Sequence, residues 1–384
     1  MGDFGRELKS FFRKGDMILL VMCLTISAFG CLIIASTNNW RGFTRYVVVQ
    51  IAAIGLGVLA YAIMSSIDLD FFSEHRGILV VLSMGLLLML IPFGTDLGSG
   101  NRSWLDLPLI PVNVQPAEIC KISYILITAS VMASHQNNVS SIRSVIHMGI
   151  HLALLVGTNL VLSGDAGVSL IFVFIFIGMA FAGGVKLIWF LFAGAGIAAV
   201  GPVIWTNFME PHQRNRILVL FDPTIDPQGT KERYHMIRSL KSLTGGGMTG
   251  QGLFNGNRTQ IGALPSQHTD FIFSAIGEEM GYLGCAVVII MLLALVARCI
   301  WVGSKSPDYM RRIVCFGAAA ALMFQIIVNV GMCMGVMPVI GLTLPLISYG
   351  GSSVVTIYAM LGLVSGVHAR PSPRSHERYI RPPR

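Results

Sequence analysis

The sequence predicts an all-α integral membrane protein with ten transmembrane helices, and its composition and its apolar runs lead to this prediction. Hydrophobic residues make up 54% of the chain, charged residues only 12%, and the mean hydropathy is +0.70. A soluble helical bundle would need many more charged side chains to cover its exterior. The apolar residues also fall in runs of about 20, the length that crosses a bilayer. We therefore expect lipid to solvate most of the surface.

Ten apolar runs follow one another along the chain. They cover residues 17–37, 46–64, 77–93, 116–134, 145–163, 166–183, 186–206, 270–298, 312–334 and 350–367. No small-residue cleavage signal follows the first run, so we interpret it as a retained span and not as a signal peptide. An even number of crossings places both termini on one side. Residues 17–367 then form one membrane domain between a cytoplasmic N-terminus (1–16) and a basic tail (368–384).

Lysine and arginine residues set the orientation of these spans. With the N-terminus in the cytoplasm, most cations of the short connections are cytoplasmic, and the short outer loops hold only Arg41, Arg45 and Arg102. This distribution follows the positive-inside rule. The net charge of +8 therefore reflects topology, and we expect membrane lipids, not nucleic acid, as partners. The Pro-rich basic tail is expected to be disordered and attracted to anionic lipid.

The connection between the seventh and eighth runs, residues 207–269, is too long to be a simple turn. We expect it outside the cytoplasm and with a functional role. Its first part, PHQRNRILVLFDPTIDPQG, has the amphipathic pattern of a helix in the interface plane. Its second part, LTGGGMTGQGLFNGNRTQIGALP, holds seven glycines in 23 residues, which predicts a segment that is flexible or close to a ligand.

Acidic residues stand at the start of the eighth run, where burial of a charge is costly. Asp270, Ser274 and Glu278 recur every fourth residue, which predicts a polar stripe on one helix face that lines a cavity. Asp270 alone could be an ordinary first-turn residue, favoured by the helix dipole. A residue that only stabilises the helix N-terminus does not require further polar residues at every fourth position, so we interpret Asp270 as functional.

A second group of charges opens the fourth run. Glu118 and Lys121, three residues apart, share a helix face, as in an internal ion pair. Alternatively, Lys121 and the loop residue Arg102 offer positive charge to a phosphate group. Asp165, between the fifth and sixth runs, is a further carboxylate at the same depth. A base beside cations that hold a diphosphate suits transfer of a sugar from a lipid diphosphate.

Four separated motifs, HTDFIFSAIGEEMG, QPAEICK, FDPTIDPQG and GLTLPLISYGGSS, resemble those of the SEDS family (shape, elongation, division, sporulation), in particular its RodA-type members. The resemblance covers nearly the whole chain. It implies a peptidoglycan glycosyltransferase that polymerises lipid II for cell elongation in the bacterial cytoplasmic membrane, with a class B penicillin-binding protein as partner. It also implies that activity depends on Asp270, with Glu118, Lys121, Asp165 and Arg102 around the cavity.

The last of these motifs supplies further candidates for the cavity wall. A Pro-broken segment precedes Ser348, Gly350 and Ser352, and small residues there can leave backbone groups free at membrane depth or simply pack helices closely. No motif requires a cofactor or metal, although a divalent cation on the diphosphate would be compatible. The seven cysteines form no CxxC pair and suggest neither a zinc site nor a disulfide framework.

Three other functions would use the same features. A flippase for lipid-linked cell-wall precursors would move the headgroup through the same cavity without reacting it. An FtsW-like polymerase would perform the same chemistry in cell division. A scaffold would only position a partner synthase.

Overall fold

The computed structural model describes residues 15–38, 44–96, 101–106, 114–207 and 209–371. Within them, nine helices are long and apolar enough to cross a membrane, and the shorter apolar helix α9 adds a tenth candidate. The cytoplasmic N-terminus and the basic tail that we predicted fall mostly outside the described residues.

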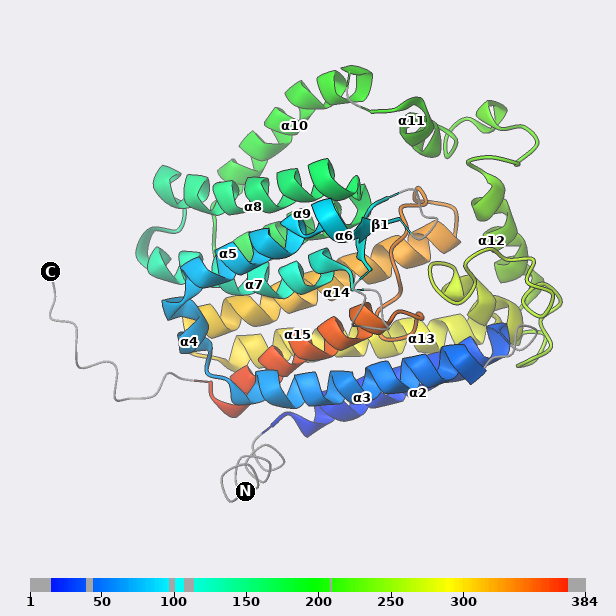
Figure 1. Cartoon of the computed structure of the whole chain (residues 1–384), viewed down its shortest axis with the longest axis horizontal. Coiled ribbons are helices and arrows are strands. Elements are labelled where there is room, and N and C mark those ends of the chain that lie inside the picture. The colour runs from blue at the N-terminus through cyan, green and yellow to red at the C-terminus, as the bar shows by residue number, and fades with distance from the viewer. Residues whose placement is uncertain (1–14, 39–43, 97–100, 107–113, 208, 372–384) are drawn as a thin grey trace, which may run out of the picture.

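The ten apolar segments begin and end within a few residues of the predicted spans, except that the eighth extends seven residues further. They are α2 (Met17–Thr37), α3 (Thr44–Ser66), α5 with α6 (Arg76–Leu88 and Leu90–Phe93), α7 (Pro116–Ser134), α8 (Ile142–Ser163), α9 (Ala166–Ala182), α10 (Leu187–Asn207), α13 (Ile272–Lys305), α14 (Tyr309–Cys333) and α15 (Gly351–Ala369). The shorter elements are α4 (Leu69–Glu74), η2 (Gln136–Asn138), α11 (Pro211–Leu218), η3 (Pro223–Ile225), α12 (Tyr234–Gly245), β1 (Gly94–Thr95) and β2 (Trp104–Leu105). Figure 1 shows a bundle with α4 at one end and the β1–β2 hairpin and α12 at the other.

The β1–β2 hairpin is a small departure from the all-α prediction. Gly94 pairs with Leu105 and Thr95 with Trp104 in antiparallel register. Two-residue strands carry almost no periodic signal, so the sequence pattern could not reveal them.

The tight turn between α8 and α9 is made by Gly164 and Asp165. Gly164 has a φ of 69°, the left-handed conformation that commonly ends a helix. The Asp165 carboxylate then accepts the backbone N–H of Val168 at 3.1 Å and caps α9. Two residues are therefore enough to reverse the chain at the outer surface.

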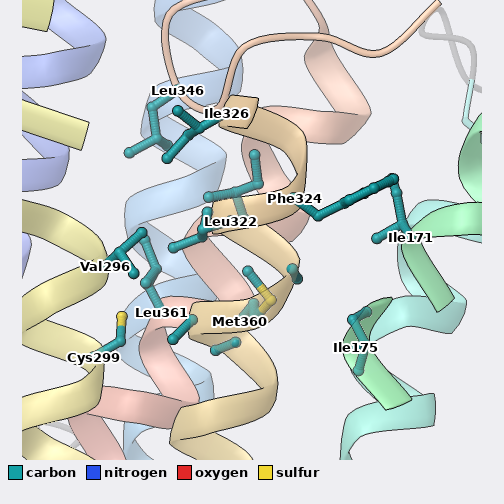
Figure 2. Close-up of a cluster of buried hydrophobic side chains, with 14 of the residues drawn as sticks. Ile171, Ile175, Val296, Cys299, Leu322, Phe324, Ile326, Leu346, Met360 and Leu361 are labelled. Carbon is teal, nitrogen blue, oxygen red and sulfur yellow. The ribbon is translucent and has the colours of Figure 1, made fainter. Parts of the chain in front are cut away.

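Close helix packing holds the bundle together. Gly362 and Gly366, one turn apart on α15, face the backbone of α3 so closely that a Cβ on Gly362 would lie 2.5 Å from the carbonyl oxygen of Tyr61. Small residues at this spacing allow two helix backbones to approach in a membrane. Figure 2 shows the apolar core beside this contact, where Phe324 of α14 points toward Ile171 of α9.

Two groups of ion pairs tie the cytoplasmic ends of the helices. Arg298 of α13 bonds both oxygens of Asp16 at 2.9 Å. Arg311 of α14 contacts Asp68 at 2.8 Å and Asp70 at 2.9 Å. These contacts fix the end of the bundle that is opposite the candidate site.

Candidate active site

Asp270 lies in the turn immediately before α13, outside the membrane-spanning helices. We predicted a helix that begins at Asp270, but α13 begins at Ile272. The Asp270 carbonyl oxygen accepts the side-chain amide of Asn329 at 2.8 Å, and the same amide donates to Leu342 at 2.7 Å. Asn329 of α14 thus joins the backbone of Asp270 to the segment before α15.

The segments around Asp270 and around Ser348 are bonded directly to each other. The Ser348 hydroxyl donates to the Thr269 carbonyl at 2.6 Å and accepts the N–H of Leu344 at 2.8 Å. The N–H of Tyr349 donates to the His268 carbonyl at 2.8 Å. Ser348 is buried and satisfied, so in this conformation it positions Thr269 and Asp270, and direct contact with substrate stays a prediction.

The Asp270 carboxylate faces the turn at Gly341, where an added Cβ would lie 3.8 Å from its Oδ2 atom. Burial raises the pKa of Asp270 to about 6; the hydroxyl of Thr269 opposes this shift and the charge of Asp165 adds to it. A carboxylate with a pKa near neutral pH is suited to accept a proton during catalysis.

Asp165 is the second carboxylate of this group. Its Oδ2 atom accepts Gln115 at 3.3 Å and Ser103 at 3.4 Å, in addition to the capping bond of its Oδ1 atom. Burial raises its pKa, and the charge of Glu118 contributes in the same direction. Asp165 therefore lies within electrostatic range of both Glu118 and Asp270.

Lys121 is buried and forms an ion pair with Glu118. Its Nζ atom lies 2.8 Å from the Glu118 carboxylate, whose Oε2 atom also accepts the Thr356 hydroxyl at 3.1 Å. The structure thus contains the internal ion pair that the spacing suggested. Engagement of a diphosphate by Lys121 requires this pair to rearrange.

Arg102 is exposed, and its guanidinium donates to the Gly94 carbonyl at 3.2 Å. This bond braces the β1–β2 hairpin at the outer end of the bundle. Its role as a phosphate ligand stays a prediction.

Glu278 and Ser274 do not form the open polar stripe that we predicted. Ser274 bonds Ser239 of α12 at 2.6 Å. Glu278 is completely buried and accepts the backbone N–H groups of Arg258 and Thr259. It therefore holds the outer loop in place, which corrects our expectation that it lines an open cavity.

The glycine-rich segment is closely packed against α13, in contrast to the flexible segment that was one of our expectations. Gly281 interrupts α13 with a φ of 69°, which leaves backbone groups without helical partners. The loop supplies them, because Tyr282 and Leu283 donate to Gly247 and Met248 at 3.0 and 3.2 Å. Beside this break, Glu279 accepts Thr259 at 2.8 Å and Gln260 at 3.0 Å.

Gly350 and Ser352 lie at the start of α15. The N–H of Gly350 donates to Gln50 of α3 at 3.3 Å. The Ser352 hydroxyl is buried without a hydrogen-bond partner among the described residues. Ser352 is thus the small residue of this motif that retains an unused polar group.

Sequence reasoning missed several residues around Asp270. The rings of Tyr46, His268 and Tyr349 form a cluster with centroid distances of 5.0 to 5.6 Å. The two tyrosines could have been identified because aromatic residues are enriched at membrane interfaces. For Asn329, the signal was an amide in an otherwise apolar run.

Comparison with known proteins agrees with the motifs. A family model described as "Cell cycle protein", for FtsW, RodA and SpoVE, matches residues 16–372. The chain belongs to this family. Its similarity to the peptidoglycan glycosyltransferase MrdB of Escherichia coli K12 is 31% identity over 367 residues, 94% of this chain and 95% of that protein. A probable peptidoglycan glycosyltransferase FtsW of Thiomicrospira cyclica is 32% identical, with 91% and 90% covered.

Solved structures of the family share the fold. A chain from a structure titled for the coordination of polymerization and crosslinking by a peptidoglycan synthase complex matches with a TM-score of 0.80 and 28% identity, covering 93% of this chain and 98% of that one. The rod shape determining protein RodA of Thermus thermophilus, as an aspartate-to-alanine mutant, matches with a TM-score of 0.68 and 27% identity, covering 92% and 97%. The membrane fold that the composition predicted is therefore confirmed.

Proposed function

We propose that the protein is a peptidoglycan glycosyltransferase that polymerises lipid II at the outer face of the bacterial cytoplasmic membrane. The observation that carries this proposal is the environment of Asp270, a carboxylate with a pKa raised to about 6 on a backbone fixed by Asn329 and Ser348. Relatives with the same chemistry carry both elongation and division names. We assign the elongation role because the sequence motifs favour the RodA type.

In the proposed reaction, Asp270 accepts the proton of the acceptor sugar hydroxyl. The hydroxyl oxygen bonds to the anomeric carbon of the donor sugar as the bond from that carbon to the diphosphate breaks. Lys121 and Arg102 stabilise the negative charge that develops on the leaving diphosphate. A divalent cation on the diphosphate is compatible with this scheme, and the scheme assigns no protein ligands to it.

The remaining candidates support this centre. Asp165 holds the outer segments around Gln115 and Ser103, and its charge adds to the effect of burial, which raises the pKa of Asp270. Ser352 offers its unused hydroxyl to the substrate. The ion pair with Glu118 holds Lys121 in place until a diphosphate displaces the carboxylate.

We also propose a class B penicillin-binding protein as partner, which would crosslink the glycan strands. Support comes from the similarity to a chain of a peptidoglycan synthase complex. Activity is therefore best measured with and without the cognate partner.

The test is polymerisation of fluorescent lipid II by the purified protein in detergent. Asp270→Asn should abolish glycan polymer, whereas Asp106→Asn, a matched change at an exposed outer carboxylate, should not. Intact lipid II translocation in vesicles without polymer would indicate a flippase. Unchanged cell growth with Asp270→Asn would indicate a scaffold.

A further inference from the structure

An open groove with basic side chains lies at the cytoplasmic end of the bundle, opposite the candidate active site. It encloses about 470 Å³ and is lined by His135, Ile142, Arg143, Ile146, His147 and Ile150. His135 ends α7, and the other residues belong to the first turns of α8. The positive-inside orientation places this groove in the cytoplasmic leaflet.

Two parallel stripes of α8 form the wall of the groove. Ile142, Ile146 and Ile150 recur every fourth residue and are 66%, 56% and 52% exposed. In a membrane, this apolar stripe meets acyl chains. The neighbouring stripe, also with a spacing of four, consists of Arg143 and His147, which line the groove, and His151, one turn beyond it; it presents cationic or hydrogen-bonding groups.

The histidines of the groove form a row. The rings of His135 and His147 are 5.7 Å apart, and those of His147 and His151 are 5.4 Å apart and stacked. The Nδ1 atom of His135 lies 2.9 Å from the Val131 carbonyl oxygen. The same ring nitrogen lies 3.0 Å from the Ser134 hydroxyl. A hydrogen bond from His135 to a phosphate oxygen requires a proton on Nε2, because that oxygen only accepts.

Within the part of the chain that the structure describes, the arginines in and near the groove have no acidic partner. Arg76, at the start of α5, lies within electrostatic range of His147 and His151. Neither Arg76 nor Arg143 forms an ion pair with another residue that the structure describes. Unpaired cations beside an exposed apolar stripe complement a ligand that joins a phosphate to an acyl chain.

We propose that this groove binds an anionic phospholipid of the cytoplasmic leaflet. The phosphate lies between Arg143, His147 and His135, and one acyl chain runs along Ile142, Ile146 and Ile150. Basic pockets between helices on the cytoplasmic side recognise anionic headgroups by this combination of charge and depth. The proposal is independent of the reaction at Asp270.

The test is native mass spectrometry of the full chain in detergent, titrated with cardiolipin or phosphatidylglycerol and, separately, with neutral phosphatidylcholine. Arg143→Gln should weaken binding of the anionic lipids roughly five-fold, the effect of one cation near a lipid surface. Lys305→Gln, at an exposed cytoplasmic lysine outside the groove, should change it little. Ile146→Ser should also weaken binding, because it removes part of the acyl contact.

Several results would overturn the proposal. They are equal binding of phosphatidylcholine, equal losses in Arg143→Gln and Lys305→Gln, and displacement of the lipid by millimolar inorganic phosphate, which would indicate a simple anion site. Arg143 and Ile146 are exposed, so both variants should keep the wild-type melting temperature. If Arg143→Gln alters it, Ile146→Ser decides the test.

Discussion

Replacement of Asp270 by asparagine should abolish activity and at the same time make the protein more stable. Burial raises the pKa of Asp270 from 3.8 to about 6, which means that the fold disfavours the ionised carboxylate. Two pKa units correspond to about 3 kcal/mol, an upper limit because the side chain is partly exposed. Asp270→Asn removes the charge and hence this destabilisation.

The sign of this effect gives it a characteristic pH dependence. The destabilisation by Asp270 is absent below the unfolded pKa near 3.8, grows as pH rises, and is complete above pH 6. Asp270→Asn should therefore melt at a higher temperature than the wild type at pH 7.5 and at nearly the same temperature at pH 4. Wild-type polymerisation should fall as pH drops through about 6.

Thermal unfolding of the detergent-solubilised protein at both pH values measures this difference. Asp106→Asn, which alters an exposed carboxylate, is the matched control and should leave the melting temperature close to that of the wild type. Equal or lower stability of Asp270→Asn at pH 7.5 would refute the conclusion that the fold strains this carboxylate. The polymerisation assay on the same samples separates stability from catalysis.

Three further changes test the neighbouring contacts. Lys121→Met should lower the free energy of unfolding by about 3 to 5 kcal/mol, because it leaves Glu118 buried and unpaired. Adding Glu118→Gln should restore the melting temperature but not polymerisation. Recovery of both would show that Lys121 has no role in catalysis. Glu279→Gln should lower the free energy of unfolding by about 3 kcal/mol, because a charged acceptor forms strong hydrogen bonds to the loop. Glu74→Gln, at an exposed position, should not change it, and equal melting temperatures of the two variants would contradict the prediction. Gly246→Ala should destabilise the protein by about 1 to 3 kcal/mol, since a Cβ there would overlap the Gly277 carbonyl. Gly149→Ala, with open space around it, is the control. Similar protease sensitivity of the two variants in limited proteolysis would contradict close packing of the loop.

The membrane helices could be predicted from the sequence because runs of apolar residues report directly on burial in lipid. Boundaries such as those of α2 and α7 coincide with the predicted ones for this reason. The outer half of α13 could not be predicted in the same way. Its acids contact a loop that is distant in sequence: Glu278 accepts the backbone N–H groups of Arg258 and Thr259, and Glu279 accepts the side chains of Thr259 and Gln260.

The candidate site shows the same contrast between features that could be predicted from the sequence and features that could not. The titratable residues Asp270, Asp165, Glu118 and Lys121 stood out because charges at membrane depth are costly. The positioning roles of the neutral residues were not predicted: Asn329 was missed, and Ser348 was expected only at the cavity wall, since both act through carbonyl groups of other segments. A sequence pattern can single out a polar residue in an apolar run, but it does not show which distant carbonyl group that residue contacts.

The interruption at Gly281 has a consequence for how the chain is assembled during synthesis. α13 has 34 residues, about 51 Å of helix, whereas a bilayer core of about 30 Å needs only about 20 of them. The part after Gly281 can insert by itself, but the part before it is completed only by a loop that has already crossed the membrane. Export of that loop must therefore precede completion of the candidate active site, so a translocation defect would yield an inserted but inactive chain.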